Sequence, residues 1–228
     1  MPGLQGPRRV VSGMADFAVV PERLALVNVD VQCCFVGDSP LGCPEAAVVL
    51  PRINRVAAAC RAAGILVVHV SHVLRADGSN TGVLGEISPI VRQGFLSAGS
   101  PSAALHPDLV VDARDVLVEK PRFGAFHATD LELILRARGV DSIIITGIAT
   151  NVCCDTTARE AFARDFRVFF LSDGTANSAI DELSAEDVKR ATCATLDRRF
   201  AQVLTVDQMI GRIADAAQRR GHSGDHAR

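Results

Sequence analysis

The segment SIIITGIATNVCCDTTAREAF, residues 142–162, decides the fold class of this protein. Its first part, Ser142 to Gly147, is an uninterrupted apolar run of the kind that forms a strand buried on both faces of a sheet. The part that follows has helical spacing and contains two adjacent cysteines, Cys153 and Cys154. A buried strand that leads directly into a helix is the unit from which parallel α/β sheets are built.

The same alternation recurs along the chain. Strands are predicted at residues 24–29, 65–70, 115–120, 142–147, 167–173 and 201–205, with helices between most of them. Such a pattern predicts an α/β protein with a six-stranded, mostly parallel sheet that helices cover on both faces. The connection from Ser71 to Asp112 is long and polar, and connections of this length within a compact domain are usually functional.

The length and composition favour a single domain. The chain has 228 residues, and 48% of them are hydrophobic, which is enough to bury a sizeable core. Residues 1–20 and 219–228 are rich in Gly, Arg and Ser, so we expect a flexible tail at each end of one domain over residues 21–218.

Several classes of function are disfavoured by composition. The net charge is −2, there is no Trp or Tyr, and no basic stripe is present, which argues against nucleic-acid binding. No apolar run is long enough to span a bilayer, and no secretory signal is recognisable. The seven cysteines form no CxxC pair and no Cys/His zinc spacing, which predicts reduced thiols, a cytoplasmic location, and no metal or other cofactor.

Three chemically active side chains follow predicted strands directly. Asp30 follows the first strand, Lys120 ends the third, and Cys153 lies shortly after the fourth. Ligands of open parallel sheets bind beyond the carboxyl ends of the strands, so these side chains are expected at one edge. With Thr150 or Asn151 as the helix cap, Cys153 falls in the first turn, where the helix dipole should lower the pKa of its thiol.

Helical spacing separates the two thiols. Cys154, Ala158, Ala161 and Phe162 share one apolar face, whereas Cys153 lies off that face. We therefore expect Cys153 to be the nucleophile and Cys154 a core residue.

A plainer interpretation remains open for each of these residues. Both cysteines could be core fillers, Asp30 a turn residue and Lys120 an ordinary surface lysine. The placement of all three at one sheet edge favours a catalytic set, in which a carboxylate serves as the base for a thiol and an ammonium stabilises negative charge.

Three segments resemble the signature segments of the isochorismatase-like cysteine hydrolases. They are LVNVDVQCCF, VEKPRFGAF and GIATNVCCDTTAREAF, at residues 26–35, 118–126 and 147–162. The resemblance implies a Rossmann-like three-layer α/β/α sandwich and a catalytic triad of Asp30, Lys120 and Cys153. It also implies a cis peptide between Ile148 and Ala149, with the N–H groups of Ala149 and Cys153 forming an oxyanion hole.

The resemblance also implies an enzymatic activity. Because the cysteine is present, it implies hydrolysis of a C–N bond in a small carboxamide, ureido or carbamoyl compound through a thioester, with release of ammonia or an amine. Within the family, KPRFGAFHAT and GIATNVC are most similar to ureidoacrylate and N-carbamoylsarcosine-type amidohydrolases. Two alternatives stay open: a vinyl-ether hydrolase of isochorismate type with Asp30 as general acid, and a catalytically silent binding protein. Relatives are commonly homodimers or homotetramers.

Further residues are expected to contact the substrate. We expect Gln32 and Phe35 at the pocket floor and Phe126 at a wall, and either Arg122 or Arg75 could pair with a substrate carboxylate. The remaining candidates are His69, Ile148 and Asn151.

Nicotinamidases of this family bind a metal through an Asp and two His after the second strand. Here His69 and His72 are present without an Asp-x-His pattern, so no metal site is expected.

Overall fold

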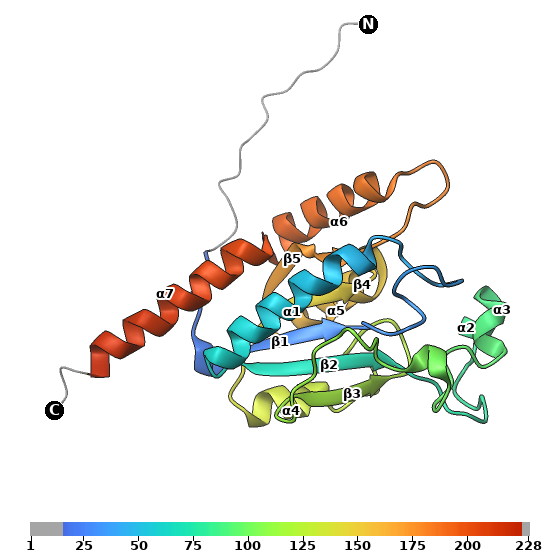
Figure 1. The fold of residues 1–228 in the computed structure, drawn as a ribbon, viewed down its shortest axis with the longest axis horizontal. Helices are drawn as coiled ribbons and strands as arrows, with labels where there is room; N and C mark the ends of the chain where they lie inside the picture. Colours follow the sequence, from blue (N-terminus) through green and yellow to red (C-terminus); the bar gives the residue numbers. More distant parts are fainter. Residues whose placement is uncertain (1–15, 225–228) are drawn as a thin grey trace, which may run out of the picture.

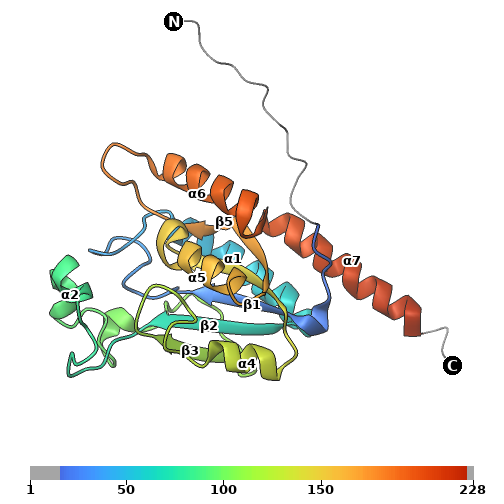
Figure 2. The ribbon, with the colours of Figure 1, turned by 180° about the vertical axis from the view of Figure 1, so that it is seen from behind.

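The computed structural model describes residues 16–224 and contains the predicted parallel sheet (Figures 1 and 2). The strands are β1 (Leu24–Val29), β2 (Leu66–His72), β3 (Val116–Lys120), β4 (Ser142–Ile148), β5 (Arg167–Ala176) and β6 (Gln202–Leu204). They lie in the order β3-β2-β1-β4-β5-β6, and every neighbouring pair is parallel. The predicted α/β class and six-stranded sheet are confirmed.

Helices cover both faces of the sheet and give three layers. The longer helices are α1 (Ala46–Ala62), α4 (Leu131–Ala137), α5 (Asp155–Phe162), α6 (Ala185–Arg199) and α7 (Val206–Gly224). Helices α1 and α7 lie on one face, and α4, α5 and α6 lie on the other, which Figure 2 shows from behind. The chain thus has the expected α/β/α sandwich.

The alternation of side chains along β1 explains how one strand serves two cores. Leu24 and Leu26 pack toward α1 and α7, whereas Ala25, Val27 and Val29 pack toward α4 and α5. Because successive side chains of a strand point to opposite faces, a strand between two helix layers is mostly apolar. The exception in β1 is Asn28, which is buried and hydrogen-bonds to the ring of His69.

Two strands end two or more residues later than the sequence predicts. Strand β2 continues through Ser71 and His72, which pair with Glu119 and Lys120 of β3. Their polarity suggested a loop, but the ladder continues because β3 offers partners up to its last residue. Strand β5 likewise continues to Ala176.

Part of the expected N-terminal tail packs against the domain. Phe17 meets Phe169 edge to face, with ring centroids 6.0 Å apart, and its N–H donates to Gln202 Oε1 at 3.2 Å. At the other end, α7 extends through Gly224. The rest of both expected tails, residues 1–15 and 225–228, lies outside the described residues.

The long connection after β2 contains short helices rather than a structureless loop. It includes α2 (Leu84–Ile87), α3 (Pro89–Arg92) and the 3-10 turn η2 (Pro101–Ala103); the chain has another such turn, η1 (Pro21–Arg23). Leu84, Val91 and Leu96 form a small buried cluster with Cys34 and Leu74. Helices α2 and α3 therefore lie over the carboxyl end of the sheet, at one end of the molecule (Figure 1).

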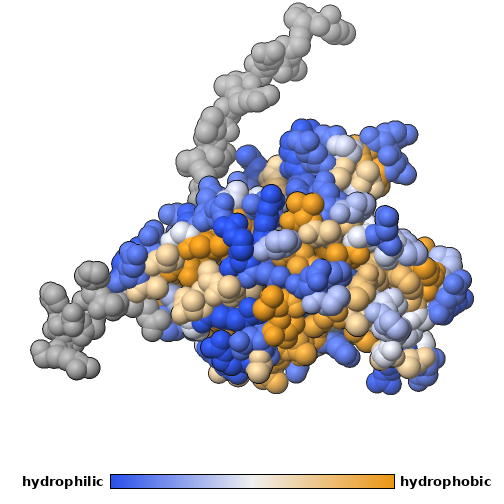
Figure 3. Space-filling view, viewed as in Figure 1, coloured by the Kyte–Doolittle hydropathy of each residue, from blue (hydrophilic) through white to orange (hydrophobic). Residues whose placement is uncertain are grey.

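The surface mixes hydrophilic and hydrophobic residues, and the latter gather in several patches on the face drawn in Figure 3. Val48, Ile87 and Leu133 are among the most exposed large hydrophobic residues. Within residues 16–224, no helix combines the length and the apolar character needed to cross a membrane.

Gly147 lets β4 approach β1 at the edge where the site forms. Its φ is +126°, and a Cβ atom at this position would overlap the carbonyl oxygen of Val29. Gly64 also has a positive φ, +73°, but a Cβ there would meet no atom within 4 Å.

Gly147→Ala is therefore expected to lower the free energy of unfolding by about 3 kcal/mol or more, because it adds an overlap with the backbone to the cost of the φ angle. Gly64→Ala, which meets only the φ cost, is expected to lose about 1 kcal/mol. Urea unfolding of both variants measures the difference, and equal losses would contradict the role assigned to Gly147.

Candidate active site

The site begins at Asp30, the residue directly after β1. Its N–H donates to Val70 O at 2.8 Å, which continues the ladder between β1 and β2 by one residue. Its φ is +54°, in the left-handed region that is uncommon for residues other than glycine. The chain therefore turns out of the sheet at Asp30, whose side chain is fully buried.

Lys120 reaches Asp30 from the end of β3. Its Nζ lies 2.7 Å from Asp30 Oδ2, and both side chains have no exposed surface. The same Nζ donates to Arg122 O at 2.9 Å. The interpretation of Lys120 as a surface lysine is wrong, because the residue is fully buried in an ion pair.

Cys153 approaches this pair from the other side of β1. It lies in the π-helical turn η3 (Thr150–Cys154), between β4 and α5, and the peptide bond between Ile148 and Ala149 is cis, as the resemblance implies. The thiol lies beside both groups, close enough to influence the pKa of each. The three predicted side chains thus converge, although only 5% of Cys153 is exposed.

The predicted helix cap is wrong. Neither Thr150 nor Asn151 caps the helix; the residue before the turn is Ala149, whose carbonyl accepts from the N–H groups of Val152 and Cys154. The Thr150 hydroxyl instead donates to Thr175 Oγ1 at 2.9 Å.

Both cysteines belong to the core beneath α5, but Cys153 also lines a cavity, which Cys154 does not. Cys154, Ala158 and Ala161 have no exposed surface and belong to the core beneath α5. Phe162, which was expected on the same face, is 49% exposed because it lies at the end of α5.

The charges of the site follow from its burial. Burial raises the pKa of the Asp30 carboxyl, against the lowering effect of the neighbouring Lys120 ammonium. Burial alone would lower the pKa of Lys120, but Asp30 and Cys153 raise it overall. Asp30 is therefore a stronger base than an exposed carboxylate, and Lys120 remains charged.

The expected low pKa of Cys153 is wrong. Burial raises the pKa of this thiol well above its usual value, and Asp30 adds to the increase, while Lys120 opposes it. The helix dipole does not dominate, because the thiol is enclosed and lies next to a carboxylate. The resting site thus holds a protonated thiol beside a base, rather than a preformed thiolate.

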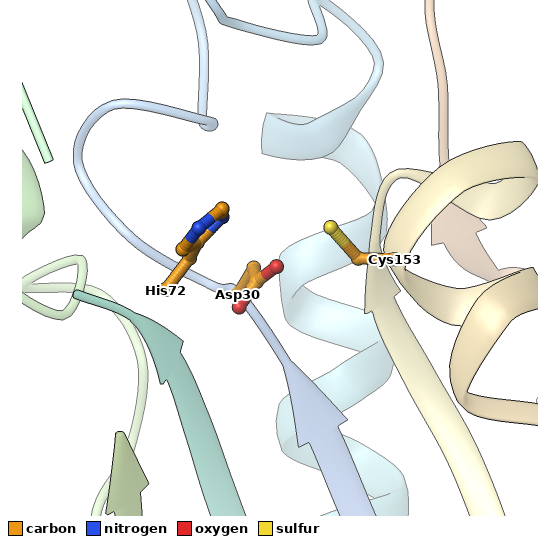
Figure 4. A group of neighbouring side chains, drawn as sticks. All are labelled: Asp30, His72 and Cys153. Carbon is orange, nitrogen blue, oxygen red and sulfur yellow. The ribbon is translucent and has the colours of Figure 1, made fainter. Parts of the chain in front are cut away.

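His72 is a fourth member of the site that the sequence did not single out as a substrate contact. One atom each of Asp30, His72 and Cys153 lie within 4.8 Å of one another, and Figure 4 shows the three side chains facing a common space. Burial, and then Lys120, lower the pKa of His72 to about 3, so the imidazole is neutral. The predicted strand ended at residue 70; had it been predicted to continue to residue 72, His72 would have been expected at the carboxyl edge of the sheet.

These side chains could in principle hold a metal ion, since all three are ligand types. However, the ammonium of Lys120 contacts the Asp30 carboxylate at 2.7 Å and would repel a cation at the same place. The donor set therefore fits acid–base chemistry better than metal binding.

A cavity of about 270 Å³ opens beside the thiol. Phe35, Ile148 and Ala149 line it together with Cys153, as expected. Most other lining residues were not singled out from the sequence. Phe123 and Val152 lie within signature segments, and the others come from segments with no chemical signature: Leu41, Cys43, Leu84, Ile87, Ser88, Val91 and Leu96. Asn151 is half-buried and is not among them.

Gln32 lies elsewhere than expected. Its Oε1 accepts from the N–H of His72 at 2.7 Å, and its Nε2 donates to the carbonyls of His72 and Ala103. The side chain therefore joins the end of β2 to the long connection, and it is not part of the cavity floor.

His69 and Phe126 are not in the cavity either. His69 contacts Asp115 at 2.9 Å, and Asp115 also pairs with Arg61, so this histidine belongs to a buried network within the sheet. Phe126 packs against Phe166 in the core, with ring centroids 5.7 Å apart.

Both candidate arginines line a separate pocket. Arg75 and Arg122 border a space of about 690 Å³ that shares no lining residue with the cavity at Cys153. Arg122 Nη1 donates to the carbonyls of Asn80 and Pro121. Neither arginine is among the described residues that line the cavity at Cys153, whereas Lys120 of the site lines the same pocket as they do.

The fold agrees with comparisons to known proteins. Residues 24–208 match the isochorismatase domain. A ureidoacrylate amidohydrolase, RutB, of Methylobacterium radiotolerans is 33% identical over 83% of this chain and 79% of its own. The RutB of Variovorax paradoxus is 28% identical over 95% of this chain and 91% of its own.

Solved structures give the same result. A cysteine hydrolase from Pseudomonas syringae pv. phaseolicola superposes with a TM-score of 0.87 at 34% identity, over 90% of this chain and 99% of that one. An isochorismatase family protein from Desulfovibrio vulgaris has a TM-score of 0.74 at 28% identity, over 84% and 98% of the two chains. Since the domain match spans most of the sequence, this chain belongs to the isochorismatase family of hydrolases.

Proposed function

We propose that this protein is a cysteine-dependent amidohydrolase that cleaves a C–N bond of a small carboxamide, ureido or carbamoyl compound. The observation that carries the proposal is the convergence of Cys153, Asp30 and Lys120 beside a cavity. The amidohydrolase names of the RutB relatives support the same bond type.

The proposed reaction begins with proton transfer from the Cys153 thiol to Asp30, whose raised pKa suits it to act as a base. Sulfur attacks the substrate carbonyl carbon, and the resulting oxyanion accepts hydrogen bonds from the N–H groups of Ala149 and Cys153. Asp30 returns the proton to the nitrogen, the C–N bond breaks, and ammonia or an amine leaves a thioester.

Water completes the cycle. Asp30 takes a proton from a water molecule, whose oxygen attacks the thioester carbonyl, and the C–S bond breaks with return of a proton to sulfur. The sum is amide plus water giving carboxylic acid plus amine. Lys120 keeps Asp30 ionised between these steps, because its ammonium is the counter-ion of the carboxylate.

The two alternatives are less well supported. Vinyl-ether hydrolysis needs only the acid Asp30 and assigns no task to a thiol that lies beside both charged groups. A silent binding protein would have no need for the ion pair at the cavity. Assays of carboxamides and ureido acids for ammonia release, and of isochorismate for pyruvate release, separate these functions: ammonia from an amide supports the proposal, and turnover of isochorismate alone contradicts it.

From the family resemblance we also propose that the protein is a homodimer or homotetramer. Light scattering after size-exclusion chromatography tests this, and a monomer at micromolar concentration would contradict it.

Cys153→Ala is expected to reduce kcat at least 1,000-fold, because the nucleophile is lost (order of magnitude). Cys154→Ala is the matched control; it should retain kcat within about 3-fold and lose about 1 kcal/mol of stability, as a small core deletion. Ammonia release and urea unfolding are the measurements. An active Cys153→Ala with an inactive Cys154→Ala would invert the assignment.

The loss of kcat/KM at low pH should follow protonation of the Asp30 carboxylate. Since the carboxyl pKa is raised, kcat/KM should fall on acidification at a pH above 3.8, the ordinary aspartate value. Lys120→Met removes a cation that lowers this pKa, so the acid limb should move to higher pH in the residual activity. Lys189→Met, at a lysine paired with Glu45 on the surface, is the control and should leave the limb in place. An unmoved limb in Lys120→Met would contradict the coupling.

A further inference from the structure

The cavity beside Cys153 is lined almost entirely by hydrocarbon. Leu84, Ile87, Val91 and Leu96 enclose it from the α2–α3 segment, and Phe35 and Phe123 are among the other lining side chains. No arginine, lysine or carboxylate side chain is among its described lining residues.

Lys120, the cation beside the thiol among the described residues, is already engaged. Lys120 Nζ lies 2.7 Å from Asp30 and donates to Arg122 O, so it cannot neutralise a second carboxylate without losing the first. The guanidinium groups of Arg75 and Arg122 border the other pocket. A substrate carboxylate in this cavity would therefore be desolvated without a partner, which costs several kcal/mol in proteins.

The groups that can form hydrogen bonds with a ligand lie at the end of the cavity next to the Cys153 sulfur. Within the described residues, Nε2 of His72 is buried and has no hydrogen-bond partner, and this ring faces the space shared by Asp30 and Cys153 (Figure 4). A buried imidazole nitrogen needs a partner, and the N–H or carbonyl of an amide supplies one. One polar end at the thiol and an apolar remainder match an amide group with a hydrocarbon substituent.

We infer that the substrate of Cys153 is a small, uncharged carboxamide whose acyl group is aliphatic or aromatic, rather than a ureido or carbamoyl acid. This inference rests on the proposed amide hydrolysis. The cavity of about 270 Å³ lies near the lower end of the usual size of ligand pockets, so the acyl group has only a few carbons beyond the amide.

The test compares two amides of matched length, pentanamide and glutaramate, in which a carboxylate replaces the terminal methyl group. We expect kcat/KM for ammonia release to be at least about 100-fold higher for pentanamide, because the carboxylate has no partner. From propanamide to pentanamide, kcat/KM should rise about 4-fold per methylene, the value of a buried CH₂ group. Preference for glutaramate or ureidoacrylate would overturn the inference while leaving the proposed function intact.

Binding measurements distinguish the proposed amide hydrolysis from the inferred preference for an uncharged, apolar ligand. Calorimetry on Cys153→Ala, which retains the cavity, should detect pentanamide and not glutaramate. If the wild-type protein binds pentanamide but hydrolyses no amide, the proposed function fails and the apolar ligand class stands. If the variant binds glutaramate more tightly, the apolar ligand class fails whatever the activity.

A charge at the mouth of the cavity provides a second test. Ile87 lines the cavity and is 75% exposed, so Ile87→Arg adds a cation there with little effect on folding. This variant should reduce the preference for pentanamide over glutaramate at least about 5-fold. Val83→Arg, at a residue of the same segment that is 61% exposed and does not line the cavity, should leave the ratio unchanged. Equal ratios in the two variants would show that the substrate chain does not occupy this cavity.

Discussion

The buried ion pair between Asp30 and Lys120 is the interaction on which the site depends. Neither side chain has exposed surface, and their charged atoms lie 2.7 Å apart. Removing two charges from water is costly, and their attraction offsets this cost only while both are present. The pair therefore holds the ends of β1 and β3 in a fixed relation, and it sets the charge state in which the neighbouring thiol remains protonated.

Sheet topology explains why three residues so far apart in sequence can meet. The order β3-β2-β1-β4 places the carboxyl ends of four parallel strands side by side. Asp30 leaves the central strand, Lys120 reaches across β2, and Cys153 approaches from the turn after β4. Gly147 permits the close approach of β4 to β1 that this convergence requires. His72, at the end of β2, completes the edge with a neutral imidazole.

The environment of the thiol differs from that of the nearby guanidinium groups. Arg75 and Arg122 border one pocket, whereas Cys153 lies in a second cavity that is lined mainly by apolar side chains. The segment that contains α2 and α3 makes this division, because its apolar residues turn toward the thiol. The ion pair with its neighbouring thiol and most of the apolar lining of the cavity are thus supplied by different parts of the chain.

Local patterns in the sequence were enough to predict the six parallel strands and the placement of Asp30, Lys120 and Cys153 at one edge of the sheet. The role of Cys153 as nucleophile, as distinct from Cys154, stays a prediction. The periodicity of apolar residues and the position of a residue relative to a strand end are local properties, so they can be recognised in a single sequence. The tertiary structure decided three features that the sequence did not predict. They are the raised pKa of the Cys153 thiol, the presence of His72 in the site, and the absence from the cavity of Gln32, His69, Phe126 and both arginines. Burial and contact depend on which distant segments cover a residue, and no local pattern contains that information.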